Sequence, residues 1–341
     1  MPNLKTVAEQ VGVSISTVSN AYNKPDQLSS ELRSRIFEAA AELGYAGPDA
    51  AARTLRSGKS WTIGLLMTER LSYGFSDPYA VQFLAGLTTA CEARQIGVLL
   101  LPVVEDGSGN LRHPAIDAFA TFGLDSDHPA ARAFLDRNVP FVGGTRLDDP
   151  KTSWVAIDEA AASARIGQHL SRLGHRNVAV VVSANCSSSY QRSEFAGPED
   201  LADLNSSARF AGLSAAMPEA NLQVFNSAPN SVDAGRLAGE TLLDQQNRPT
   251  AIICLADVQA LGVLEAMKVR GLAPGKDVSL TGFDDIPAAA AAGLTTVHQP
   301  AFERGRLTGE LLIDQERTDR QITLDTQLVV RSSTGPAPKP L

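Results

Sequence analysis

From residue 61 onward, short runs rich in β-branched residues alternate with stretches of helical length, and this alternation constrains the fold more than any other feature. The strand-like runs are residues 62–67, 98–104, 141–142, 155–157, 178–182, 222–225, 251–255 and 278–283. The helical stretches are residues 81–95, 130–138, 160–173, 206–217, 234–246, 258–270 and 302–317. Such alternation predicts parallel sheets covered by helices on both faces. Because about 280 residues are more than a single hydrophobic core usually accommodates, we expect two lobes.

Residues 4–45 have a different pattern, that of three short helices. Thr6 and Glu9 have the spacing of a capping box, so we expect Thr6 to begin the first helix and Gly12 to end it. The small apolar residues of this segment are expected to form its core: Val7, Ala8, Val11, Val13 and Val18.

The second and third helices have their own start and stop signals. Ser14 is expected to cap a helix that runs to Asn23, and Ser29 a helix that ends at Gly44. Two short helices joined by a tight glycine turn are typical of a helix-turn-helix, whose second helix enters the major groove of DNA. A plain three-helix cap with solvated serines and threonines is the alternative.

The charge distribution separates this segment from the rest. The chain carries 38 acidic and 30 basic side chains, a formal charge of −8, which does not favour phosphates over its whole surface. The first 60 residues hold seven basic and six acidic side chains. DNA binding must therefore depend on where these side chains stand rather than on net charge.

The cysteines and the hydropathy indicate a cytoplasmic protein with no membrane partner. Cys91, Cys186 and Cys254 stand too far apart for a zinc or redox pair, so we expect three inert thiols. The sequence has neither an apolar run of about 18 residues nor a signal-peptide core at its start.

Residues 6–23 resemble the lactose-repressor (LacI) family of bacterial transcription regulators, most specifically in the Gly-Val-Ser-x-x-Thr-Val-Ser core at residues 12–19. Further similar segments extend the resemblance over nearly the whole chain: residues 43–45, 52–59, 173–175, 209–212, 282–285 and 294–297. The resemblance implies a helix-turn-helix headpiece followed by an α/β effector core of two Rossmann-like lobes, as in periplasmic sugar-binding proteins, with three crossovers and a ligand between the lobes.

For the headpiece, the resemblance implies that Ile15, Ser16 and Asn20 face bases. It further implies phosphate contacts and a hinge helix at residues 50–56, whose Leu55 enters the minor groove as an apolar wedge; an ordinary core leucine is the alternative. The remaining residues expected at DNA are Thr6, Ser14, Thr17, Ser19, Asn23 and Arg53. The family usually has Arg where Asn20 stands, and because Asn pairs with adenine, the usual operator is not expected here.

For the effector, three acidic positions fit the rule that ligands lie beyond the carboxyl ends of parallel strands: Asp77, Asp158 and Asp284. Tyr79 follows Asp77 and can cover a ring face. The resemblance adds Arg209, and Gln299 is a weaker candidate. Simpler roles remain open: a helix cap for Asp77 and Asp257, a surface ion pair for Arg209, and a turn-stabilising role for Asp284.

Two departures concern the same pocket. Ala256 stands where many members have Asn, and Asn230 where sugar-binding members often carry an aromatic residue. A sugar or polyol is still the expected effector, because the family resemblance implies one.

No catalytic pattern competes with this interpretation. The sequence lacks the glycine-rich phosphate loops of nucleotide-binding enzymes, and its five histidines have no metal-ligand or catalytic spacing. We expect no enzyme activity, no cofactor and no metal.

Together these observations predict a transcriptional regulator, most simply a repressor, that binds a pseudo-palindromic operator as a homodimer or tetramer and responds to a small-molecule effector. The alternative is a solute-binding protein with a non-functional head. The expected domains are residues 1–46 (helix-turn-helix), 47–60 (linker and hinge) and 61–334 (effector and dimerisation), with a disordered tail at 335–341. We expect one lobe at about 61–157 and 297–322 and the other at about 158–296 and 323–334.

Overall fold

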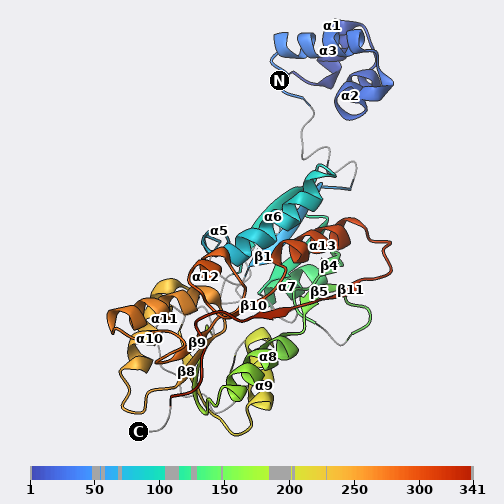
Figure 1. Cartoon of the computed structure of the whole chain (residues 1–341). Helices are drawn as coiled ribbons and strands as arrows, with labels where there is room; N and C mark the ends of the chain where they lie inside the picture. Colours follow the sequence, from blue (N-terminus) through green and yellow to red (C-terminus); the bar gives the residue numbers. More distant parts are fainter. Residues whose placement is uncertain are drawn as a thin grey trace. The chain divides into compact units, whose positions relative to one another are not determined.

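A computed structural model describes residues 2–47, 54, 58–67, 71–103, 115–123, 129–146, 149–183, 201, 204–227 and 229–338. The chain forms two compact units, residues 1–60 and residues 61–341 (Figure 1). Among the described residues no helix is long and apolar enough to cross a membrane.

Residues 2–47 of the N-terminal unit form three α-helices and one short 3-10 helix, namely α1 (Leu4–Val11), α2 (Ile15–Asn23), η1 (Pro25–Gln27) and α3 (Ser30–Glu42). The predicted caps of the second and third helices are confirmed: Ser14 Oγ accepts from the Thr17 amide at 3.0 Å and Ser29 Oγ from the Leu32 amide at 3.3 Å. Gly12 ends α1 in the left-handed conformation, with φ 75°, which glycine adopts without steric cost.

The predicted cap of the first helix is wrong. Asn3 caps α1, and its Oδ1 accepts from the amides of Lys5 and Thr6. Thr6 instead is the third helical residue, and its hydroxyl accepts from the Asn3 amide at 2.7 Å. A capping box is present but begins three residues earlier than expected, because Asn is at least as good an N-cap as Thr.

The core of this unit is small but closed. Val7, Val18 and Ile36 are fully buried, one from each α-helix. The ring of Tyr22 meets Phe37 and Tyr45 edge-on at centroid distances of 5.1 and 6.2 Å. These contacts join the three helices around one common core.

The larger unit contains two four-stranded sheets that are parallel throughout, as the alternation predicted. The first has the strand order β2-β1-β3-β4 and the second β7-β6-β8-β9. Their strands are β1 (Thr62–Met67), β2 (Gly97–Pro102), β3 (Ala118–Phe122), β4 (Phe141–Val142), β6 (Asn177–Val182), β7 (Asn221–Asn226), β8 (Ala251–Cys254) and β9 (Ser279–Thr281).

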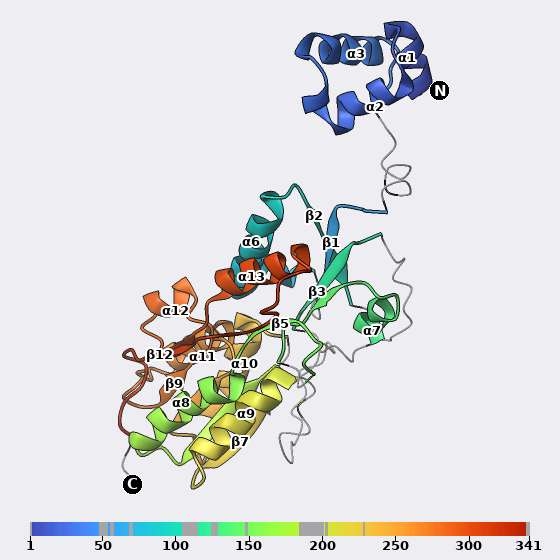
Figure 2. The same cartoon turned by 90° about the vertical axis from the view of Figure 1, so that its right-hand side faces the viewer.

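Helices cover both faces of each sheet (Figures 1 and 2). On the first sheet, α6 (Pro78–Glu92) packs with α13 (Ala301–Ile313) on one face, and α7 (Pro129–Leu135) covers the other. On the second, α8 (Glu159–Arg172) and α9 (Leu204–Ala216) lie opposite α10 (Val232–Leu243) and α11 (Asp257–Val269).

The central strand β6 shows why its sequence reads as an unbroken apolar run. Val178, Val180 and Val182 pack towards α8 and α9, whereas Ala179 and Val181 pack towards α10 and α11. Because alternate side chains of a strand point to opposite faces, a strand covered on both sides must be apolar at every position.

The two sheets are linked by strands that sequence reasoning found only in part. β5 (Trp154–Ile157) pairs in parallel with β11 (Gln321–Leu324), and β10 (Thr296–His298) pairs antiparallel with β12 (Gln327–Val329). Strands β3, β10, β11 and β12 and the short helices α5 (Tyr73–Ser76) and α12 (Pro287–Ala291) were not predicted. Most of these elements are too short or too rich in alanine and polar residues to give a periodic signal.

The expected disorder of the C-terminal tail is wrong for residues 335–338. The Gly335 carbonyl lies 3.0 Å from His175 Nε2 and accepts from the Ser279 hydroxyl at 3.1 Å. The Ala337 amide donates to the Leu173 carbonyl at 2.8 Å. These bonds to His175, Ser279 and Leu173 offset the entropy that the chain loses on becoming ordered. The Pro-rich composition alone had predicted disorder.

Candidate functional site

The first candidate site is the exposed face of α2. Ile15 opens this helix with 49% of its surface exposed, and the neighbouring Ser14 and Ser16 are also exposed. This half-exposed apolar side chain at a helix start, beside two exposed serines, is not part of the buried core of the N-terminal unit. It suits contact with a surface that is both apolar and polar, such as the edges of base pairs in a groove.

The polar side chains of α2 are held in place by one another. Ser14 Oγ lies 2.7 Å from both Ser16 Oγ and Thr17 Oγ1. Asn23 Nδ2 donates to the Ser19 carbonyl at 2.9 Å, and Asn20 Nδ2 to Gln27 Oε1 at 3.3 Å. The link from Asn20 to the short helix η1 was not foreseen, and it orients the amide that we expect to face bases.

Not every residue expected at DNA can be placed. Thr6 is exposed on α1, where its hydroxyl belongs to the capping box. Arg53 and Leu55 lie outside the described residues, as does the rest of the expected hinge helix apart from Thr54.

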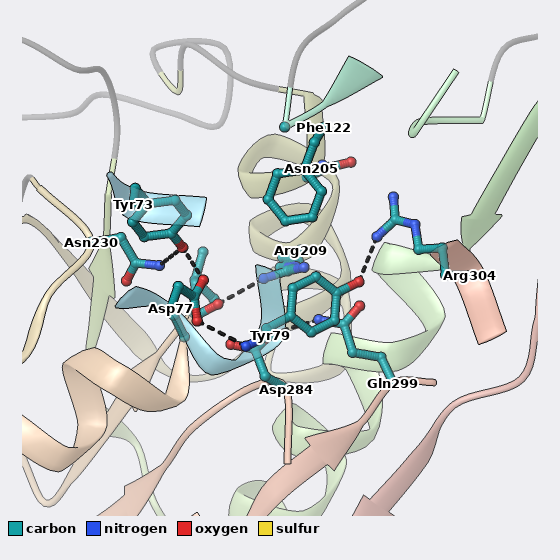
Figure 3. Close-up of a pocket in the computed structure, with 13 residues that line it drawn as sticks. Tyr73, Asp77, Tyr79, Phe122, Asn205, Arg209, Asn230, Asp284, Gln299 and Arg304 are labelled. Atoms are coloured by element: carbon teal, nitrogen blue, oxygen red, sulfur yellow. Dashed lines mark hydrogen bonds between the residues drawn. The ribbon is translucent and has the colours of Figure 1, made fainter. Parts of the chain in front are cut away.

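The second candidate site is a cavity of about 140 Å³ in the larger unit (Figure 3). Side chains from both lobes and from the crossing segments line it. They are Tyr73, Asp77, Tyr79, Phe122, Asn205, Arg209, Asn230, Leu255, Ala256, Asp284, Gln299 and Arg304, together with Gly123. The charged and amide side chains that converge on it, beside aromatic rings, suit a small polar molecule.

Arg209 is fixed by three contacts. Its Nε donates to Glu159 Oε2 at 2.6 Å, its Nη1 donates to the Leu255 carbonyl at 2.7 Å, and its guanidinium lies 3.8 Å from the centre of the Phe283 ring. Burial disfavours the charged form, but the carboxylates of Glu159 and Asp284 offset this effect and raise the pKa of Arg209 above its usual value. Arg209 therefore presents a permanent cation to the cavity.

Arg304, which the sequence analysis missed, anchors the opposite side of the cavity from α13 (Figure 3). Its Nη1 donates to the Tyr79 hydroxyl at 2.7 Å, its Nε to the Val155 carbonyl at 3.2 Å, and its Nη2 to the Gly144 carbonyl. The buried guanidinium thus ties the start of α6 to Val155 in β5 and to Gly144, which follows β4.

The two cavity carboxylates are held by neutral donors. Asp77 caps α6 by accepting from the Tyr79 amide at 3.0 Å, and it also accepts from the Tyr73 hydroxyl. Asp284 accepts from Gln299 Nε2 at 2.5 Å. Asp284 also has a φ of 127°, a region that side chains other than glycine rarely occupy, and strain of this kind persists where the surrounding structure enforces it.

Burial raises the pKa of the carboxyl groups in and near the cavity. Desolvation raises the pKa of Asp77 and, more strongly, that of Asp284, which the neighbouring charges of Asp257 and Asp77 raise further. Behind them, burial raises the pKa of Asp257 to about 6. Asp257 does not cap α11; it accepts from the Ile286 amide at 2.9 Å and from Thr296 Oγ1 at 2.7 Å.

Five of the six expected effector residues line the cavity: Asp77, Tyr79, Arg209, Asp284 and Gln299. Asp158 does not. It caps α8 by accepting from the Ala161 amide at 2.9 Å and pairs with Arg146 at 2.9 Å. A strand-end aspartate is equally suited to capping the helix that follows, and here the cap takes Oδ1 while Arg146 takes Oδ2.

Sequence reasoning also missed Tyr73, Phe122 and Asn205 and regarded Asn230 only as a departure from a pattern. Tyr73 and Asn205 lie next to segments without periodicity, so no sequence signal marked them. No cluster of three or more His, Cys, Asp or Glu side chains that could hold a metal ion occurs in the part of the chain that the structure describes.

Comparison with known proteins finds matches for both parts of the chain. Residues 3–47 match the bacterial regulatory proteins of the lacI family, and residues 168–334 match the periplasmic binding protein-like domain. The chain is 35% identical to an HTH-type transcriptional regulator of Mycolicibacterium smegmatis, over 98% of this chain and 96% of that protein.

Two solved structures resemble the chain over almost its whole length. A LacI-family transcriptional regulator from Corynebacterium glutamicum has a TM-score of 0.72 at 29% identity and covers 97% of this chain and 98% of its own. The transcriptional regulator CelR in complex with cellobiose has a TM-score of 0.66 at 25% identity, with coverages of 98% and 100%. The chain belongs to the LacI family of bacterial DNA-binding transcriptional regulators, with a helix-turn-helix unit and a periplasmic-binding-protein-like core.

Proposed function

We propose that this regulator is a repressor that binds a pseudo-palindromic operator as a homodimer and is controlled by a small sugar or polyol in the cavity of the larger unit. The proposal of an effector rests on the cavity, where Arg209, Asp77 and Asp284 come together from distant parts of the chain. The hydroxyl groups of a sugar can donate to the carboxylates and accept from the guanidinium.

The DNA half rests on α2. Its exposed Ile15 can contact a thymine methyl group, Asn20 can pair with adenine, and the hydroxyls of Ser16, Thr17 and Ser19 can reach bases or phosphates. Two such helices on a two-fold scaffold read two half-sites, which makes the operator pseudo-palindromic.

The two halves are coupled through the segment between them. In our proposal, effector binding changes how the lobes close, moves the first lobes of the dimer apart and unfolds the hinge at residues 50–56, so that Leu55 leaves the minor groove. DNA affinity then falls by the ratio of the effector's affinities for the two states of the protein. A relative that binds cellobiose supports a carbohydrate in the cavity.

Selection of bound sites from random DNA with the full-length protein, followed by metabolite-induced release, tests the proposal. Ser16→Glu places a carboxylate on the exposed start of α2 and should abolish binding to the selected site, because it repels the phosphates. The control is Ser214→Glu, which makes the same change at an exposed position of α9 in the larger unit. This variant should bind DNA as the wild type does.

The outcomes separate the candidate functions. A solute-binding protein with a non-functional head would bind a sugar yet show no preference for any duplex. Sedimentation of the complex with one operator measures whether two chains bind together, and one chain per operator would contradict the dimer.

A further inference from the structure

Several hydrogen-bond donors around the cavity are already used within the protein. All three nitrogens of Arg304 donate to protein oxygens, and Nε and Nη1 of Arg209 do the same. The protein therefore occupies every nitrogen of Arg304 and two of the three nitrogens of Arg209. A guanidinium has no acceptor to offer, so the acceptors left for a ligand belong to the amides and carboxylates.

The cavity amides are oriented by the carboxylates. Asn230 Nδ2 donates to the Tyr73 hydroxyl at 2.8 Å, and that hydroxyl donates to Asp77. Gln299 Nε2 donates to Asp284 Oδ1 at 2.5 Å. The Gln299 amide thus turns its NH₂ group towards the Asp284 carboxylate, and the Asn230 amide turns its NH₂ group towards the Tyr73 hydroxyl, whose own proton goes to Asp77. In both amides the oxygen is the atom left over.

These oxygens are left without partners. Asn230 Oδ1 and Gln299 Oε1 are buried and accept no hydrogen bond from any described residue, and the same holds for Asn205 Oδ1. Gln299 is only 3% exposed. A buried acceptor without a donor costs free energy, so these three oxygens around one cavity indicate a ligand that supplies donors.

The charges favour the same ligand. Four carboxylates stand in or next to the cavity, Asp77, Asp284, Asp257 and Glu159, against the guanidinium groups of Arg209 and Arg304. Only Glu159 forms an ion pair with either of the two arginines. Desolvation raises the pKa of Asp77, Asp257 and Asp284, and neighbouring carboxylates raise the pKa of Asp257 and Asp284 further.

We propose that the effector is a polyol that carries a protonated amine, an amino sugar or aminocyclitol, whose ammonium group lies against Asp77 and Asp284 and donates to the unpaired oxygens of Asn230 and Gln299. This inference rests on the proposed function, which makes the cavity the effector site. A hydroxyl group brings one donor together with acceptors, whereas an ammonium group brings three donors, a positive charge and no acceptor. The ammonium group therefore satisfies the acceptors of this cavity without adding new ones.

Matched probes test the ligand class on the full-length protein. The panel contains glucosamine, galactosamine, mannosamine and an amino-deoxy-inositol, each beside its N-acetylated form and its hydroxyl parent. Titration calorimetry at pH 7.5 should find at least one amine that binds about tenfold more tightly than both of its neutral counterparts. The inference is overturned if no amine binds, or if a neutral counterpart binds as tightly.

A variant and a pH series test the mechanism. Asp284→Asn should remove the preference for the amine, whereas Asp244→Asn, at an exposed aspartate paired with Arg270, should leave it unchanged. Because the carboxyls of Asp77 and Asp284 hold protons at higher pH than usual, lowering the pH from 7.5 to 5.5 should weaken binding of the amine more than that of its neutral counterpart. Equal weakening of both would contradict the inference.

The same experiments distinguish failure of this inference from failure of the proposed function. If a neutral sugar binds and releases operator DNA, the proposed function stands and the amine is wrong. If an amine binds as expected but leaves DNA affinity unchanged, the ligand class stands and the proposed regulation is wrong.

Discussion

Replacing Glu159 with glutamine tests whether the buried cation beside the cavity depends on a single partner. Glu159 Oε2 accepts from Arg209 Nε at 2.6 Å, and the two side chains are 8% and 13% exposed. Glutamine has the same shape and keeps an oxygen for Nε, so the substitution removes a charge and little else. Arg209 is then left buried with its charge uncompensated by Glu159.

The expected cost follows from the geometry of the pair. Removing one partner of a fully buried ion pair destabilises a protein by about 3–5 kcal/mol. Because one hydrogen bond survives and Asp284 also favours the charged form of Arg209, we expect the lower end, about 3 kcal/mol. With a urea dependence of about 3 kcal/mol per molar, this lowers the unfolding midpoint by about 1 M.

Tryptophan fluorescence in urea measures this change selectively. The chain has two tryptophans, Trp61 and Trp154, and both belong to the larger unit. Glu219→Gln is the matched control, since Glu219 forms an exposed ion pair with Arg176, and its midpoint should not change. An unchanged midpoint for Glu159→Gln would refute the reasoning that Glu159 compensates the charge of Arg209.

Three further predictions concern packing and DNA. Gly212→Ala should destabilise the larger unit by about 2 kcal/mol, the steric cost less the gain in helix propensity; its Cβ would lie 2.1 Å from the Ala160 carbonyl oxygen. Ser214→Ala, exposed on the same helix, should leave the urea midpoint unchanged, and equal midpoints for both variants would contradict the close approach of α8 and α9. Asn20→Arg should change one base in each half-site from adenine to guanine, as measured by selection from random DNA, and an unaltered consensus would remove Asn20 from base reading. Operator affinity should fall at least about tenfold between 50 and 200 mM salt despite the acidic chain, because binding depends on local phosphate contacts, and a flat salt profile in filter binding would exclude those contacts.

Local signals were sufficient for the N-terminal unit. Ser14, Ser29 and Gly12 act on backbone groups within a few residues, so their roles could be read directly from the sequence. The error at the first helix has the same origin, because Asn3 and Thr6 are both competent caps and only the folded chain decides between them.

The parallel sheets were also predictable, because strands covered on both faces must be apolar at every position. The exception was Ala118–Phe122, a central strand whose alanines carry little strand preference. Its place is set by pairing with β1 and β4 on either side, which involves residues far away along the chain.

The sequence by itself determined that a short helical unit precedes a two-lobed α/β core, because capping and periodicity are local properties, and its resemblance to the LacI family indicated that the helical unit reads DNA. Only the tertiary structure decided what the cavity offers a ligand. Arg304 donates to Tyr79 across 225 positions and Asn230 to Tyr73 across 157, and no local pattern records such bonds. It also decided that Asp158 caps a helix while Asp284 faces the cavity, since two aspartates in similar sequence positions differ only in what the rest of the fold brings beside them.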